Sequence, residues 1–89
     1  MKYRERLARD LQDPKFKAEW EALEPEYQIA LMIIKARQEE SITQQELAKR
    51  AGLGQASLSR IETGKVSPDI ATLQKIANAV GKKLVLRFE

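Results

Sequence analysis

The chain contains neither cysteine nor histidine among its 89 residues. Disulfide bonds are therefore excluded, and zinc sites built from the usual ligands are not expected. The lack of cysteine is compatible with a reducing, cytoplasmic compartment. Catalysis without these residues would need a carboxylate or a lysine as general base and a serine or threonine as nucleophile.

Long hydrophobic runs are also missing. The longest apolar run, Ile29–Ile34, is far too short to span a membrane, and no signal peptide is visible. We therefore expect no membrane contact. A length of 89 residues allows one small domain with an appendage, whose core is marginal unless dimerisation adds to it.

The positive charge is modest and unevenly spread. The net charge is +3, from 16 basic and 13 acidic residues. Residues 1–24 carry six of each sign, so the whole excess lies in residues 25–89. A basic excess there suits contact with phosphates, although many domains that bind no nucleic acid have as much.

Two short helices are predicted in residues 1–24, which we call the arm. Asp13 and Pro14 separate them as a good N-cap and a good first helical residue. Each helix carries one apolar stripe, and such a stripe cannot form a core alone. The stripes are Tyr3, Leu7 and Leu11 in the helix over residues 2–12, and Phe16, Trp20 and Leu23 in the helix over residues 14–23. These side chains either pack on the protein's own body or bind a partner.

A third helix is predicted from Glu24 and Pro25 to about Glu40. It is apolar over much of its surface, which indicates a position in the middle of the fold. Its main stripe comprises Ile29, Met32, Ile33 and Ala36.

The stretch Thr43–Gly64 predicts two short helices joined by a tight turn. Thr43 is a good N-cap and Glu46 completes a capping box. Gly52 stands where the chain must turn with a positive φ. A small core is expected from Leu47, Ala51, Leu53, Leu58 and Ile61. This is the layout of a helix-turn-helix, although an αα-hairpin in an unrelated bundle would share it.

The outer face of the second helix favours DNA binding. Its residues are short polar, small and basic ones, without the glutamates of an ordinary solvated face: Gln55, Ala56, Ser59 and Arg60. Gln55 can pair with adenine, Ala56 can contact a thymine methyl, and Arg60 can read guanine or hold a phosphate. The expected phosphate contacts are Thr43, Gln44, Ser57 and Lys65.

The end of the chain predicts one more helix and a strand. The helix begins after Ser67-Pro68-Asp69 and stops near Gly81, with Ile70, Leu73, Ile76, Ala77 and Val80 facing the core. Residues 83–89, which we call the tail, alternate Leu84, Leu86 and Phe88 with Lys83, Val85 and Arg87. A lone strand needs a partner, so we expect it to pair with its twin across a dimer axis.

The run TQQELAKRAG…QASLSRIETGKVSPDIATLQKIANAVG resembles the phage-repressor-like (XRE, Cro) helix-turn-helix family over about residues 29–81. The resemblance implies a partly buried ion pair between Arg37 and Glu62. It also implies that Ser57, Ser59 and Lys65 lie on a convex surface, so neither an enzyme nor a cofactor is expected. Two positions depart from the family pattern: Ser41 where glycine is frequent, and Gly54 where serine or threonine would contact a phosphate.

The arrangement of the arm before the helix-turn-helix is similar to that of HigA-type antitoxins. That resemblance implies a basic RelE-like ribonuclease toxin as partner, beside a palindromic DNA operator bound by a homodimer. We thus expect a mainly α protein in three parts: a toxin-binding arm (1–24), a DNA-binding domain (25–82) and a dimerisation strand (83–89). It would be a cytoplasmic, nucleoid-associated prokaryotic protein. The alternatives are an autonomous repressor without a toxin and, with little support, a bridging module that does not bind DNA.

Overall fold

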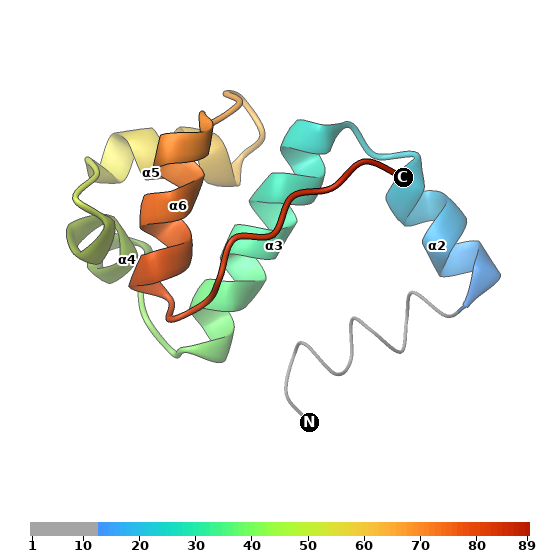
Figure 1. Ribbon diagram of the computed structural model, residues 1–89. Coiled ribbons are helices and arrows are strands. Elements are labelled where there is room, and N and C mark those ends of the chain that lie inside the picture. Colours follow the sequence, from blue (N-terminus) through green and yellow to red (C-terminus); the bar gives the residue numbers. More distant parts are fainter. Residues whose placement is uncertain (1–12) are drawn as a thin grey trace.

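The computed structural model describes residues 13–89, so the predicted helix over residues 2–12, with Tyr3, Leu7 and Leu11, lies outside the described part. Over residues 13–89 the chain forms α2 (Pro14–Glu21), α3 (Pro25–Glu39), α4 (Gln44–Ala51), α5 (Gln55–Glu62) and α6 (Ile70–Ala79). Figure 1 shows α4, α5 and α6 packed together on one side of α3, with α2 on the other side. This is the predicted helical bundle with an N-terminal helical extension.

The core lies where α3, α5, α4 and α6 meet. Leu47 of α4 and Leu58 of α5 are completely buried, and α3 packs on α5 while α4 packs on both α5 and α6. Small residues let the backbones approach closely at this centre. The buried cluster comprises Ile33, Leu47, Ala48, Ala51, Leu58, Ile61, Ile76 and Val80. The helix-turn-helix core is thus close to the one predicted.

Two residues predicted to face the core are exposed. Met32 of α3 is 47% exposed and Ile70, the first residue of α6, is 62% exposed. Helical spacing assigns each of them to the apolar stripe of its own helix, but the neighbouring helices bury only part of each stripe. For Met32 and Ile70 the prediction was wrong.

The connections use the backbone conformations expected of them. Gly52 ends α4 with φ +71° and Gly81 follows α6 with φ +70°. Ser41, between α3 and α4, has φ +56° and is the one non-glycine residue with positive φ among residues 13–89. A side chain in this left-handed region is strained, so the turn that glycine usually makes is kept here at some cost.

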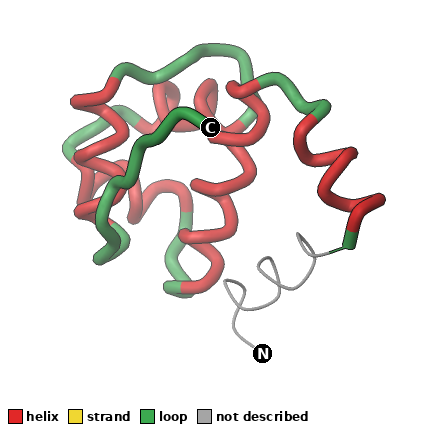
Figure 2. The backbone as a smooth tube through the Cα atoms, turned by 45° about the vertical axis from the view of Figure 1, so that its right-hand side comes forward, coloured by secondary structure: helices red, strands yellow, loops and turns green. Residues whose placement is uncertain are grey.

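The tail forms no strand in the single chain, as Figure 2 shows by its loop colour. Just before the tail, Lys82 Nζ lies 3.3 Å from Glu39 Oε1 in an ion pair. The apolar tail residues Val85, Leu86 and Phe88 are exposed. A strand exists only through hydrogen bonds to a neighbouring strand, and residues 13–89 contain no other strand to pair with it. The predicted C-terminal strand is therefore absent from this structure.

Among the described helices, none is long and apolar enough to cross a membrane.

Candidate nucleic-acid interface

The first helix of the motif, α4, begins at a side-chain cap. The hydroxyl oxygen of Thr43 accepts a hydrogen bond of 3.0 Å from the backbone N–H of Glu46. The predicted capping box is only half formed, because the Glu46 carboxylate accepts from Arg50 Nε at 3.1 Å instead. The cap still directs the N-terminus of α4 outward, with Thr43 exposed.

The second helix, α5, presents most of the predicted DNA-contact residues to solvent. Gln55, Ala56, Ser57 and Arg60 are exposed, as is Lys65 just beyond the helix, and Ser59 is half-buried. The opposite face of α5 is buried through Leu58, Ile61 and Glu62. The helix is thus anchored on one side and free on the side that would read DNA.

A chain of polar contacts joins the N-termini of α4 and α5. Gln44 Nε2 donates to Glu62 Oε1 at 3.2 Å, and Gln44 Oε1 accepts from Gln55 Nε2 at 3.5 Å. Gln44 is half-buried while Gln55 is exposed. The structure therefore brings these two predicted contact residues together, with the side-chain amide of Gln55 donating to Gln44.

The chain of contacts ends in the ion pair that the resemblance implies. Arg37 Nη2 lies 3.0 Å from Glu62 Oε1, and Arg37 Nε donates to Glu62 Oε2 at 3.1 Å. Arg37 Nη1 also donates to the carbonyl of Ile42 at 3.3 Å. Arg37 therefore ties α3, the α3–α4 turn and the recognition helix α5 together, which is a structural role.

The sequence did not predict that Gln44 would bind Glu62. Such a contact joins residues 18 apart on different helices. No local pattern reports it, and the only available signal is the polar character of both residues. Consequently Gln44 has a positioning role beside the phosphate contact predicted for it.

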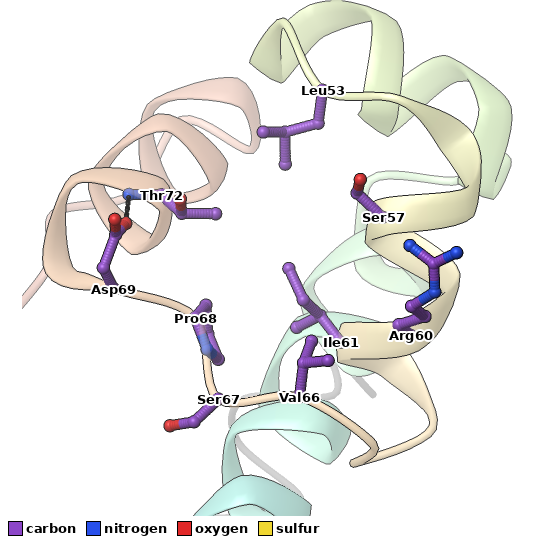
Figure 3. A pocket seen from close by; sticks show the side chains of 9 residues that line it. All are labelled: Leu53, Ser57, Arg60, Ile61, Val66, Ser67, Pro68, Asp69 and Thr72. Carbon is purple, nitrogen blue, oxygen red and sulfur yellow. Dashed lines mark hydrogen bonds between the residues drawn. The ribbon is translucent and has the colours of Figure 1, made fainter.

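A groove of about 420 Å³ lies beside the recognition helix (Figure 3). Ser57 and Arg60 of α5 form one wall, and Asp69 and Thr72 at the start of α6 form the other. Its remaining lining residues are Leu53, Ile61, Val66, Ser67 and Pro68. Arg60 borders this groove from the exposed side, so its guanidinium is free to reach outward.

Asp69 serves as the N-cap of α6. Its carboxylate accepts from the backbone N–H of Thr72 at 2.7 Å. Hydrogen bonds from Thr72, first from its side chain and then from its backbone, lower the pKa of Asp69. The carboxylate is thereby held as an anion that stabilises the start of α6.

The end of the recognition helix touches the start of α3. Gly64, two residues after α5, has φ +73°, and a Cβ atom built on it would lie 2.6 Å from the ring of Tyr27. Only glycine fits here, because both the conformation and the space exclude a side chain. The sequence prediction assigned no role to Tyr27.

The arm's second helix, α2, lies against α3 through Trp20. The carbonyl of Trp20 accepts from Gln28 Nε2 at 2.7 Å, and Lys35 Nζ lies 6.0 Å from the centre of the Trp20 ring. Burial lowers the pKa of Lys35. Phe16 and Trp20 are half-buried and Leu23 is exposed, so α2 lies on the body without joining its core.

Within residues 13–89, no group of three or more acidic side chains is placed to hold a metal ion.

The geometry is that of helix-turn-helix proteins, in which a small bundle displays the outer face of its second motif helix. A family model described as "Helix-turn-helix" matches residues 33–86. The chain belongs to this XRE-type family, whose members are DNA-binding regulators and not enzymes.

Three relatives illustrate the range of similar proteins. Antitoxin HigA1 of Mycobacterium tuberculosis is 34% identical over 77 residues, which cover 86% of this chain and 52% of that protein. The HTH-type transcriptional regulator PuuR of Escherichia coli is 42% identical over 48 residues, 54% of this chain and 26% of PuuR. The uncharacterized HTH-type regulator y4dL of Sinorhizobium fredii is 37% identical over 51 residues, 57% of this chain and 26% of y4dL. The chain thus spans between a quarter and about half of these relatives. No solved structure matches.

Proposed function

We propose that this protein is a DNA-binding antitoxin that represses its own operon as a homodimer and neutralises a RelE/HigB-like ribonuclease toxin. The observation that carries this proposal is the extent of the similarity to Antitoxin HigA1. Of the 89 residues, 77 are matched, which leaves 12, so the match includes at least half of residues 1–24. The similarity to PuuR is confined to 48 residues, about the length of a helix-turn-helix domain.

The DNA-reading role rests on the exposed side of α5 and the N-terminus of α4. Gln55, whose side-chain amide donates to Gln44, reads an adenine, and Ala56 contacts a thymine methyl. Arg60 and Ser59, one turn further on, read the neighbouring base pair or hold a phosphate. The phosphate contacts are Thr43, Gln44, Ser57 and Lys65. Because Gly54 caps α5 without a side chain, the backbone N–H groups of this helix start are open to a phosphate.

A homodimer on a palindromic operator follows from the small reach of one recognition helix. Two copies of α5 are needed about one DNA turn apart, roughly 34 Å, or at a multiple of it. We propose that the tails supply the contact by pairing as antiparallel strands across the two-fold axis. The exposure of Val85, Leu86 and Phe88 supports this. Exposed apolar side chains, on a segment whose backbone is not paired in a sheet, are suited to an interface with a second chain.

The arm is proposed to hold the toxin. Its apolar side chains are Phe16 and Trp20 on α2 and Leu23 just after it, with Tyr3, Leu7 and Leu11 outside the described residues. Support comes from the position of α2: it lies on one side of α3, and the DNA-reading helix α5 lies on the opposite side (Figure 1). Toxin and operator DNA can therefore occupy different surfaces of one molecule.

The experiment is to co-express the chain with the product of the adjacent open reading frame. Growth arrest caused by that product alone and relieved by this protein, together with co-purification of the two, supports the antitoxin. Footprinting on the shared promoter tests the repressor function separately. If the adjacent product is not toxic, or is toxic but not neutralised, the antitoxin proposal is wrong.

An autonomous transcriptional regulator is the second candidate. The specific observation in its favour is that PuuR and y4dL, both named as regulators, match at comparable identity over the helix-turn-helix portion. An isolated gene whose product binds a palindrome without a toxin partner would favour this function.

A further inference from the structure

The joint between α2 and α3 is acidic in a protein that is basic overall. Residues 13–27 contain five acidic side chains and two lysines, whereas the whole chain carries a net charge of +3. The acidic residues are Asp13, Glu19, Glu21, Glu24 and Glu26. Such a segment repels DNA phosphates and a second copy of itself, and it attracts a positively charged protein.

Trp20 is not among the large apolar side chains left free at this joint. Trp20 is turned onto α3, through its hydrogen bond with Gln28 and its contact with Lys35. Leu23, at the end of the arm, is 37% exposed, and Tyr27, in the first turn of α3, is 51% exposed. These two are therefore the large apolar groups that a partner can reach.

Glutamates flank this apolar pair without forming strong contacts of their own. Glu24 is the N-cap of α3 but makes no capping hydrogen bond with its side chain. Glu21 has one exposed pairing with Lys17, at 3.9 Å. An apolar centre with a charged, solvated rim is the usual composition of a protein interface.

The joint also borders the recognition helix. Tyr27 packs on Gly64, which follows α5 by two residues. A partner seated on Tyr27 therefore contacts the DNA-binding domain itself as well as the arm.

We infer that Leu23 and Tyr27, flanked by Glu21 and Glu24, form the docking site for a basic protein partner. We call this set the junction surface. The inference rests on the proposed antitoxin function, takes the toxin as its occupant, and moves the centre of the contact from Trp20 to the joint. Met32, also exposed on α3, has no acidic neighbours in its own turn and is not part of the surface.

The test measures binding of the purified toxin encoded by the neighbouring gene to the full-length protein. Leu23→Asp should lower the affinity at least about tenfold, because a charge replaces an apolar contact at the centre of an interface. Met32→Asp is the matched control: it makes the same change at an exposed apolar residue and should leave the affinity within about twofold. Both variants should bind operator DNA normally, which verifies their folding.

A second variant tests the charge. Glu21→Lys with Glu24→Lys should slow association with the toxin about tenfold or more at low salt, with the difference shrinking at high salt. If Leu23→Asp and the double variant bind as the unaltered protein does while Trp20→Ala does not, the junction surface is wrong and the antitoxin proposal stands. If the unaltered protein does not bind the toxin, the proposed function itself is wrong.

Discussion

Arg37 and Glu62 face each other through two hydrogen bonds, of 3.0 and 3.1 Å, that join α3 to the end of the recognition helix. The Glu62 side chain is 4% exposed and that of Arg37 is 20% exposed. Since the planar guanidinium matches the carboxylate at two points, this pair fixes the rotation of α5 as well as its position.

Arg37→Ala is expected to destabilise the fold by about 3 kcal/mol, because it leaves the Glu62 carboxylate buried without its counter-charge. Denaturant unfolding would measure this. The double variant Arg37→Met with Glu62→Leu removes both charges and should be less destabilised than Arg37→Ala. A cost below about 1 kcal/mol for Arg37→Ala would show that the pair contributes little to stability.

Gln55→Ala should cost about 1–3 kcal/mol of DNA-binding free energy at one base position and relax the preference there. The measurement is affinity for a selected operator and for its single-base variants. Gln74→Ala, an exposed glutamine of α6, serves as the control and should change nothing. A uniform loss with Gln55→Ala would contradict its proposed role in base reading.

Lys65→Ala should weaken binding to all DNA sequences. It should also reduce by about one the slope of the logarithm of the binding constant against the logarithm of the salt concentration.

Removing residues 83–89 should convert the proposed dimer into a monomer with poor operator affinity, since one half-site is lost. The truncation keeps Lys82 and its ion pair with Glu39, so the end of α6 stays anchored. Sedimentation would measure the mass, and circular dichroism would check the helices. A truncated protein that remains a tight dimer would place the interface elsewhere.

Ser41→Gly should stabilise the protein by about 0.5–1 kcal/mol, because glycine adopts a positive φ without steric cost while its greater freedom in the unfolded chain offsets part of the gain. Gly52→Ala is the matched control in the opposite direction, because it adds a side chain at a position with positive φ. No atom lies within 4 Å of an added Cβ there, so its expected loss of about 1 kcal/mol comes from the backbone conformation alone. Thermal unfolding of both variants would test the pair, and a loss of stability in Ser41→Gly would be inconsistent with strain at this turn.

The parts of the fold that the sequence predicted are those held by local chemistry. Thr43 and Gly52 mark the ends of α4, and Leu47 and Leu58 recur at the spacing that buries them. The prediction for Ile70 was wrong because periodicity identifies the apolar face of a helix but not how much of that face the neighbouring helices bury. The tail forms no strand in the single chain, because the predicted strand depends on hydrogen bonds from a second chain.

In the candidate site, residue types suggested the reading face, but the contacts between helices were beyond local patterns. Gln44 was predicted from its place at the start of α4, whereas its bond to Glu62 depends on how α4 and α5 pack. Tyr27 was overlooked because its significance comes from Gly64, 37 positions later in the chain.

The hydrogen bonds that run from Glu62 through Gln44 to Gln55 all have a fixed donor and a fixed acceptor. A carboxylate can only accept, so Gln44 must turn its amide nitrogen toward Glu62 and its oxygen toward Gln55. Gln55 must then give one amide hydrogen to Gln44, which leaves its oxygen and its other hydrogen for the base. That remaining pair of groups matches adenine, which offers a donor at N6 beside an acceptor at N7. In the proposed base-reading role of Gln55, the buried Glu62 thus sets which amide groups of Gln55 face the DNA. Glu62→Gln could donate or accept, so it would let both glutamine amides turn over and weaken the preference for one base.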